Sequence, residues 1–217
     1  MVGSNAFDTL AVLGAGPQPA TPQAFVDLVD KVVNMTAAAA QAIADQYIAP
    51  PSKYGNVTQG WWKLTADLCV ICPSAALADL FPAAKQAPTT WQYDFDGPRG
   101  LAPHTGELPY VFGPDSLPSF CGPGMGKADA CRSPYNATLG ADVMAAWRAF
   151  AWGQSLGWPD RAPGAGRKAY RTLGDGGEAT VPGDLRGAEC AVLAANLNPA
   201  QWSMLCGFGT GAPIPPV

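Results

Sequence analysis

Hydrophobic residues recur at helical spacing over several long stretches of this chain. Thr21-Pro22 is a typical helix cap and first turn, and the apolar stripe that follows it predicts a helix continuing to about Tyr47. The stripe consists of Phe25, Leu28, Val29, Val32 and Val33. The same reasoning predicts helices over 61–80 with an interruption near Pro73, around 143–153, and over 185–196.

Other stretches have the alternation of a strand. Residues 91–95 alternate aromatic and polar side chains and run into Gly97-Pro98, so they predict a strand that ends in a turn. Short strands are also expected at 1–3 and 169–173. No internal repeat and no linker is visible, so residues 1–217 are expected to form one domain with no second domain.

His104 is the only histidine, and it follows the strand expected at 91–95. Loops at the carboxyl ends of strands converge on a rigid base, which is where ligands and catalytic groups gather in α/β sheets. An imidazole is the ordinary side chain for proton transfer near neutral pH. His104 is therefore the candidate general base.

Several motifs occur in a fixed order around this histidine. They are DLCVICP at 67–73, WQYDF at 91–95, HTGELPYVFG at 104–113, WRAFA at 147–151 and WP at 158–159. Together they resemble the C-terminal part of the type-B carboxylesterase/lipase family, which includes the cholinesterases. The resemblance implies an α/β-hydrolase fold represented by its C-terminal portion only, with an incomplete central sheet flanked by helices.

The resemblance also implies catalytic roles. In the family the histidine of this motif is the base of a Ser-His-Glu/Asp triad, and that role carries over to His104. The triad acid lies in a Gly-x-Asn-x-Asp-Glu-Gly type turn, which aligns with the opening GSNAFDT and places Asp8 at the acid's position. Phe7 and Thr9 depart from that pattern. The expectation is a carboxylate oxygen of Asp8 within about 2.6–3.2 Å of a His104 ring nitrogen.

The family's nucleophilic serine stands upstream of the acid, on a Gly-x-Ser-x-Gly elbow between a strand and a helix. Only seven residues precede Asp8, and the one such run, GQSLG at 153–157, follows a helix, so Ser155 is interpreted as a helix C-terminal turn. The chain is thus expected to be part of a secreted carboxylic-ester hydrolase that lacks the serine and oxyanion loop, and to be inactive alone. Its partners would be the missing N-terminal half of the fold and a small-molecule or lipid ester, without metal or organic cofactor. The alternatives are a non-catalytic cholinesterase-like adhesion or binding domain, and an incomplete gene product with no independent function.

Six cysteines allow many pairings. The resemblance implies a bond between Cys72 and Cys190. Cys121 and Cys131 flank a glycine-rich loop that they can close locally, which leaves Cys69 with Cys206. The Cys69-Val-Ile-Cys72 spacing also fits a redox motif, but no thioredoxin-like context surrounds it, and a zinc site would need a second ligand pair.

Composition excludes some classes of function. A net charge of −4 disfavours nucleic-acid binding, and no uninterrupted apolar run approaches the roughly 18 residues of a membrane span. The cysteines and the sequons at Asn34, Asn56 and Asn136 favour a secreted or extracellular protein, although no signal peptide is visible at Met1.

The remaining candidates are assigned to support and packing. Glu107, Asp67 and Trp147 are expected beside the site or in the core, and the aromatic residues Tyr110, Phe112 and Trp158 are expected to pack.

Overall fold

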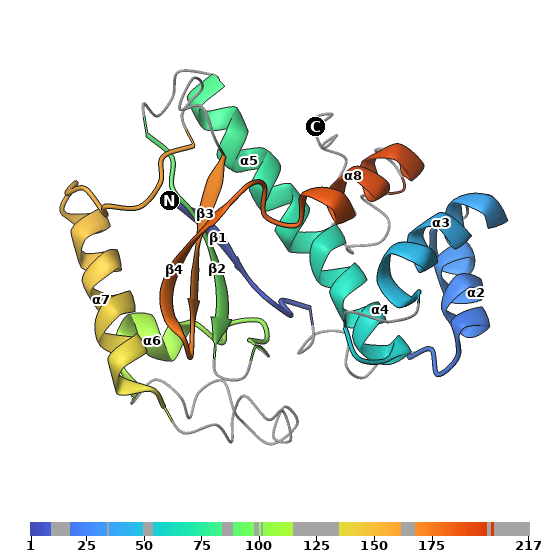
Figure 1. The fold of residues 1–217 in the computed structure, drawn as a ribbon, viewed down its shortest axis with the longest axis horizontal. Helices are drawn as coiled ribbons and strands as arrows, with labels where there is room; N and C mark the ends of the chain where they lie inside the picture. Colours follow the sequence, from blue (N-terminus) through green and yellow to red (C-terminus); the bar gives the residue numbers. More distant parts are fainter. Residues whose placement is uncertain are drawn as a thin grey trace. The chain divides into compact units, whose positions relative to one another are not determined.

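A computed structural model describes residues 1–9, 18–33, 35–49, 54–83, 89–97, 100, 102–114, 135–161, 168–198 and 201. The chain divides into two compact units, each assembled from two segments (Figure 1). The sheet unit comprises Met1–Ala11 and Ser74–Leu185, and the helical unit comprises Val12–Pro73 and Arg186–Val217. The expectation of one domain without a second one stays a prediction.

The sheet unit contains an open, mostly parallel sheet. Within the described residues its strands are β1 (Val2–Asn5), β2 (Gln92–Gly97), β3 (Ala169–Gly174) and β4 (Gly177–Pro182), in the order β1-β2-β3-β4. The first three strands are parallel, and β4 runs antiparallel to β3. The α/β class predicted from the sequence is confirmed at this level. The strand expected at 1–3 instead covers Val2–Asn5, because all four of these residues pair with β2.

Helix α7 (Ala137–Ala151) packs against β3 and β4. Its Trp147 ring lies 4.9 Å from the ring of Tyr93 on β2, in an edge-on arrangement, and also contacts Trp158. The short helix α6 (Leu108–Phe112) contacts α7. These aromatic contacts hold β2, and with it the loop that follows β2, on a fixed platform.

The hairpin formed by β3 and β4 was not predicted. Gly174 pairs with Gly177, so the strands are joined by the two-residue turn Asp175-Gly176. Asp-Gly between two extended segments is a strong hairpin signal. Here the positive φ angle, +83°, belongs to Gly177, the residue directly after the turn. The hairpin was not recognised from the sequence because β4 is largely exposed and its residues do not alternate between apolar and polar.

The helical unit contains α2 (Pro22–Val33), α3 (Ala37–Ile48), α4 (Val57–Ala66) and α8 (Gly187–Asn196). The single helix expected from Thr21 to about Tyr47 is therefore wrong. Thr36 has an extended backbone, and its hydroxyl accepts a hydrogen bond from the Ala39 backbone N–H, so it caps a second helix.

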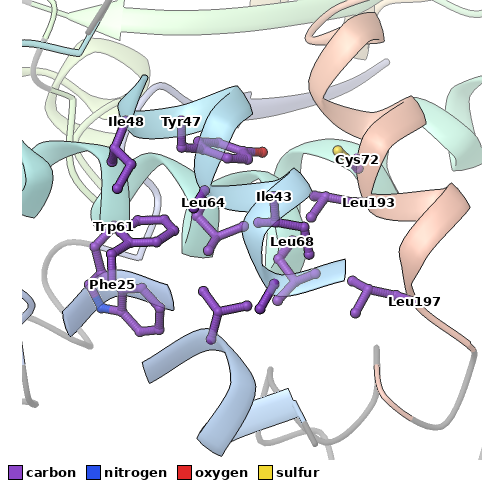
Figure 2. Packing of buried hydrophobic residues seen from close by; sticks show 13 residues of the cluster. Phe25, Ile43, Tyr47, Ile48, Trp61, Leu64, Leu68, Cys72, Leu193 and Leu197 are labelled. Carbon is purple, nitrogen blue, oxygen red and sulfur yellow. The ribbon is translucent and has the colours of Figure 1, made fainter. Parts of the chain in front are cut away.

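One cluster of buried side chains forms the core of the helical unit (Figure 2). Phe25 of α2 meets Trp61 of α4 edge to face, with 5.8 Å between ring centroids. Ile43 of α3 and Leu193 of α8 are also buried in this cluster. Helices from both segments of the unit thus share one core, and each buried aliphatic or aromatic side chain contributes roughly 1.5–3 kcal/mol.

The expected interruption near Pro73 lies slightly earlier and has a different form. A π-helical segment, η1 (Asp67–Ile71), joins α4 to α5 (Cys72–Ala83), and the Cys72 backbone N–H donates to the Asp67 carbonyl. Pro73 directly follows the π turn, where the register of the backbone hydrogen bonds shifts by one residue. The helical path continues instead of breaking, and the wide π turn sets the rotation between Asp67 and Cys72.

Two long-range links join α8 to this π segment. The Arg186 guanidinium, just before α8, forms a bidentate ion pair with the fully buried Asp67 carboxylate, which also accepts from the Tyr47 hydroxyl. Five residues further on, Cys72 is disulfide-bonded to Cys190 of α8. The two links flank the π turn, so α8 is held at two points.

Burial influences both charges of this ion pair. It raises the pKa of the Asp67 carboxyl, while hydrogen bonds from Arg186 and Tyr47 act in the opposite direction. Burial lowers the pKa of Arg186, but the hydrogen bonds and charge of Asp67 outweigh it, so that the net pKa is raised. The arginine therefore opposes the rise in the pKa of Asp67 that burial causes.

The described residues include one helical stretch, Val57–Phe81, that is long enough for a membrane span and whose most apolar 18-residue window has a mean hydropathy of 1.6. Half of its most apolar window is buried inside the protein, and Leu64 and Leu68 belong to the core of the helical unit. Core packing explains this apolar character, so the stretch is weak evidence for a span.

Candidate functional site

The parallel pairing of two chain segments brings the two candidate catalytic residues together. Beyond β1, the Phe7 backbone N–H donates to the Ala102 carbonyl at 2.8 Å, and Phe7 forms an isolated parallel bridge with Pro103. Asp8 and His104 each follow these bridge partners by one residue. Both therefore emerge side by side from the carboxyl ends of β1 and β2, where functional groups of parallel sheets converge.

Asp8 and His104 form a hydrogen-bonded pair. The Asp8 Oδ1 atom lies 2.8 Å from the His104 Nδ1 atom, although the residues are 96 positions apart. The expected contact is therefore present. The Asp8 side chain is only 8% exposed, and its Oδ2 atom accepts the backbone N–H of Asn5 at 2.8 Å. The carboxylate is thus fixed on both oxygens.

The other face of the imidazole is open. The His104 side chain is 51% exposed, and among the described residues its Nε2 atom has no hydrogen-bond partner. A carboxylate at Nδ1 favours the tautomer with the proton on that nitrogen. Nε2 then carries a lone pair that can accept a proton from a hydroxyl approaching from solvent.

The backbone around the histidine adopts a tight turn. Thr105 has a φ of +66°, a left-handed conformation that is costly for a β-branched residue, and Gly106 donates its backbone N–H to the Pro103 carbonyl at 2.9 Å. Such outliers persist where surrounding contacts over-determine them and are frequent at functional sites. The turn presents His104 at its exposed corner.

The glycine of the GSNAFDT segment, Gly3, lies close against the ring of Tyr93. Gly3 faces the Tyr93 ring so closely that a Cβ atom could not fit. Burial raises the pKa of Tyr93, and the carboxylates of Glu107 and Asp8 add to that effect. This phenol therefore stays protonated beside the acidic side of the site.

Glu107 does not contact the imidazole in this structure. Its carboxylate instead accepts a hydrogen bond from the Asn5 side chain, in agreement with the expectation of a supporting role. Trp147 contacts the aromatic residues of the sheet unit, and Asp67 is buried in the helical unit. Phe112 was expected to pack and is instead 74% exposed, because it ends a helix of five residues.

Ser155 lies outside any helix or strand, just after α7. The helix ends at Ala151, Gly153 has a φ of +67°, and the Gln154 backbone N–H donates to the Ala149 carbonyl at 2.8 Å. These are the features of a helix C-terminal turn. Ser155 directly follows this turn and does not join a strand to a helix, as a nucleophile elbow would.

The cysteine pair implied by the resemblance is present. Cys72 is bonded to Cys190, so Cys72 cannot pair with Cys69 as a redox motif would require. Cys69 is also disulfide-bonded. Cys121, Cys131 and Cys206 lie outside the described residues. The pairs Cys121–Cys131 and Cys69–Cys206 therefore stay predictions.

Two of the three sequon asparagines cap helices. The Oδ1 atom of Asn56 accepts the Gln59 backbone N–H at 2.9 Å, and that of Asn136 accepts the Leu139 N–H at 3.1 Å. Asn34 lies outside the described residues. Both caps use the oxygen of the amide, so the nitrogen that would carry a glycan is not needed for the cap.

The caps make glycosylation at Asn56 testable without loss of the fold. In a secretory host, Asn56→Asp is expected to remove one glycan while the capping oxygen remains, so stability stays within about 0.5 kcal/mol. Asn56→Ala removes both functions and is expected to cost about 1 kcal/mol more. Intact mass and thermal unfolding measure the two effects. Wild-type protein that is secreted with Asn56 unmodified would contradict the prediction.

Within the described residues, no three His, Cys, Asp or Glu side chains are placed to share a metal ion. The site as described thus consists of one acid, one base and their supporting hydrogen bonds. No protein-family model matches the chain, and no curated protein matches it.

Proposed function

We propose that this chain is the C-terminal part of a serine carboxylic-ester hydrolase, with His104 as the general base and Asp8 as the acid that orients it. The observation that carries the proposal is the 2.8 Å contact between Asp8 Oδ1 and His104 Nδ1, combined with the open Nε2 atom. The mostly parallel sheet, with both residues following adjacent strands, supports an α/β-hydrolase arrangement.

The chemistry follows from the two ring nitrogens. A serine supplied from outside these residues would attack the ester carbonyl while His104 Nε2 accepts its proton, and Asp8 stabilises the imidazolium formed. The imidazolium then gives that proton to the departing alkoxide, which leaves as an alcohol. Water deprotonated by Nε2 attacks the acyl-serine, and the acid product leaves as the serine regains a proton. Burial of Asp8 strengthens its interaction with the imidazolium.

The disulfide between Cys72 and Cys190 supports placement in an oxidising compartment. Secretion and glycosylation belong to the proposal, as does the supply of the serine and oxyanion donors by an N-terminal half of the fold. Neither adhesion nor binding requires the Asp8–His104 pair, so the proposal favours the enzyme.

Residues 1–217 alone are expected not to hydrolyse p-nitrophenyl butyrate, because these residues include no Gly-x-Ser-x-Gly elbow between a strand and a helix. A chimera that joins the elbow-bearing N-terminal part of a type-B carboxylesterase ahead of Met1 is expected to gain activity. Turnover is measured with His104→Ala as the test variant and Gln41→Ala, on an exposed helix surface, as the control.

Loss of turnover in His104→Ala alone would support the assignment of the base. The proposal fails if the isolated chain shows turnover that His104→Ala abolishes. It also fails if a chimera that unfolds cooperatively shows no activity dependent on His104.

A further inference from the structure

Asn5 connects the segment that carries Asp8 to the turn that carries His104. Its backbone N–H donates to Asp8 Oδ2, and its side-chain Nδ2 atom donates to the Pro103 carbonyl at 2.8 Å and to the Glu107 carboxylate. The residue is only 2% exposed. Both hydrogens of the amide nitrogen are therefore used, and both reach the segment that carries His104.

The two acceptors lie on either side of the histidine. Pro103 immediately precedes His104, and Glu107 follows three residues later, before the short helix α6. The Pro103 carbonyl also accepts the Gly106 backbone N–H. Asn5 consequently holds both ends of the turn whose corner is the imidazole.

Phe7 and Pro103 already align the two segments through their bridge, but this pairing ends one residue before Asp8 and His104. A side-chain rotation at either residue would separate the carboxylate from the ring nitrogen. A buried hydrogen-bond network restricts such rotation more strongly than a solvent-exposed one. The rigidity of the pair therefore has to come from the side chains around it.

We infer that Asn5 is a positioning residue for the Asp8–His104 pair, with Glu107 as the anchor of its side chain. This inference rests on the proposed function. Asparagine suits the role because it offers two donors on a short side chain, whereas aspartate offers none when ionised and would face Glu107 with like charge.

The inference can be tested on the full chain, because His104 is the only imidazole and its nitrogen resonances are unambiguous. Long-range proton–nitrogen correlation at about pH 9, where an ordinary imidazole is neutral, measures the two tautomers. In the wild type the Nδ1–H tautomer is expected to dominate. In Asn5→Ala the fraction of the Nδ1–H tautomer is expected to fall about threefold. The reason is that the turn carrying His104 loses its hydrogen bonds to the Asn5 side chain, so the ring is held less firmly against Asp8.

A core variant separates positioning from general loss of stability. Val143 is fully buried in α7 of the same unit, so Val143→Ala lowers stability without contacting the site, and it is expected to keep the wild-type tautomer ratio. Glu107→Gln retains an acceptor for Asn5 and is expected to behave likewise. An equal fall in Val143→Ala, or no fall in folded Asn5→Ala, would overturn the inference.

A variant with exchanged roles covers the case in which Asn5→Ala does not fold. In Asn5→Asp/Glu107→Gln the donor stands at position 107 and the acceptor at position 5, so one of the two side-chain bonds is restored. The Nδ1–H fraction is expected to exceed that of Asn5→Asp alone by about twofold. A fraction no higher than in the single variant contradicts the inference. An inactive chimera with a wild-type tautomer ratio would instead count against the proposed function alone.

Discussion

Asp8→Asn is expected to lower the kcat of the elbow-bearing chimera by about 10⁴-fold. The substituted side chain would present an amide that can donate to the imidazole, so His104 would carry its proton on Nε2 and could not accept one from serine. Within the described residues, the 2.8 Å contact to Nδ1 is the only hydrogen bond of the ring, which makes its tautomer depend on this one partner. Steady-state turnover of a soluble ester measures the loss.

The isolated chain offers an independent measurement of the same change. Asp8→Asn is expected to convert His104 from the Nδ1–H to the Nε2–H tautomer, visible in nitrogen chemical shifts at about pH 9. Asp8→Glu is the matched control, since it keeps a carboxylate at this position. Retention of the wild-type tautomer and turnover in Asp8→Asn would remove Asp8 from the proposed triad.

Arg186→Ala is expected to lower the free energy of unfolding by about 3–5 kcal/mol at neutral pH. The substitution leaves the Asp67 carboxylate fully buried without its guanidinium partner, while the Tyr47 hydroxyl still donates to it. Denaturant unfolding measures the effect, provided that the dependence of the unfolding free energy on denaturant concentration is the same in both proteins. Arg171→Ala is the control, because its pair with Glu178 is partly exposed and is expected to cost at most about 1 kcal/mol.

The loss in Arg186→Ala should depend on pH in a defined direction. Without the arginine, burial dominates and raises the pKa of Asp67 further above its ordinary value. A carboxyl whose pKa is raised in the folded state does not lower the free energy of unfolding at a pH where it is protonated in both the folded and the unfolded protein. Above the folded-state pKa the carboxyl is ionised in both states, and the full loss of stability is present. The destabilisation is therefore expected to be larger near pH 7 than near about pH 4. A loss that is equal or greater in acid would contradict a pKa of Asp67 raised by burial.

Much of the secondary structure follows from local patterns. The alternation at 91–95 predicted the strand that became β2, and the apolar spacing around Val143 predicted α7 with its end near Gly153. The position of His104 in a loop after strand β2 was also predicted. These features depend on neighbours within a few residues, which is the range over which propensity, periodicity and turn chemistry operate.

Other local features were decided by interactions that the hydrophobic pattern does not record. The break between α2 and α3 depends on the cap at Thr36, while the apolar stripe continues past it. The exposed strand β4 is stabilised by its pairing with β3 and needs no apolar face of its own. The π turn at Asp67–Ile71 replaces a proline break, because the backbone there bonds one residue further along the helix.

The sequence by itself determined strand β2 and helix α7, the single histidine after a strand, and the cysteines and motifs on which the family resemblance rests. The pairing of Asp8 with His104 was expected through that resemblance, and the parallel bridge of Phe7 with Pro103 supplies its physical basis. Only the tertiary structure decided that Asn5 spans both loops and that Arg186 reaches Asp67 across 119 positions. Such contacts depend on the path of the chain in space, because residues distant in sequence become neighbours only after the sheet and the helical core have formed.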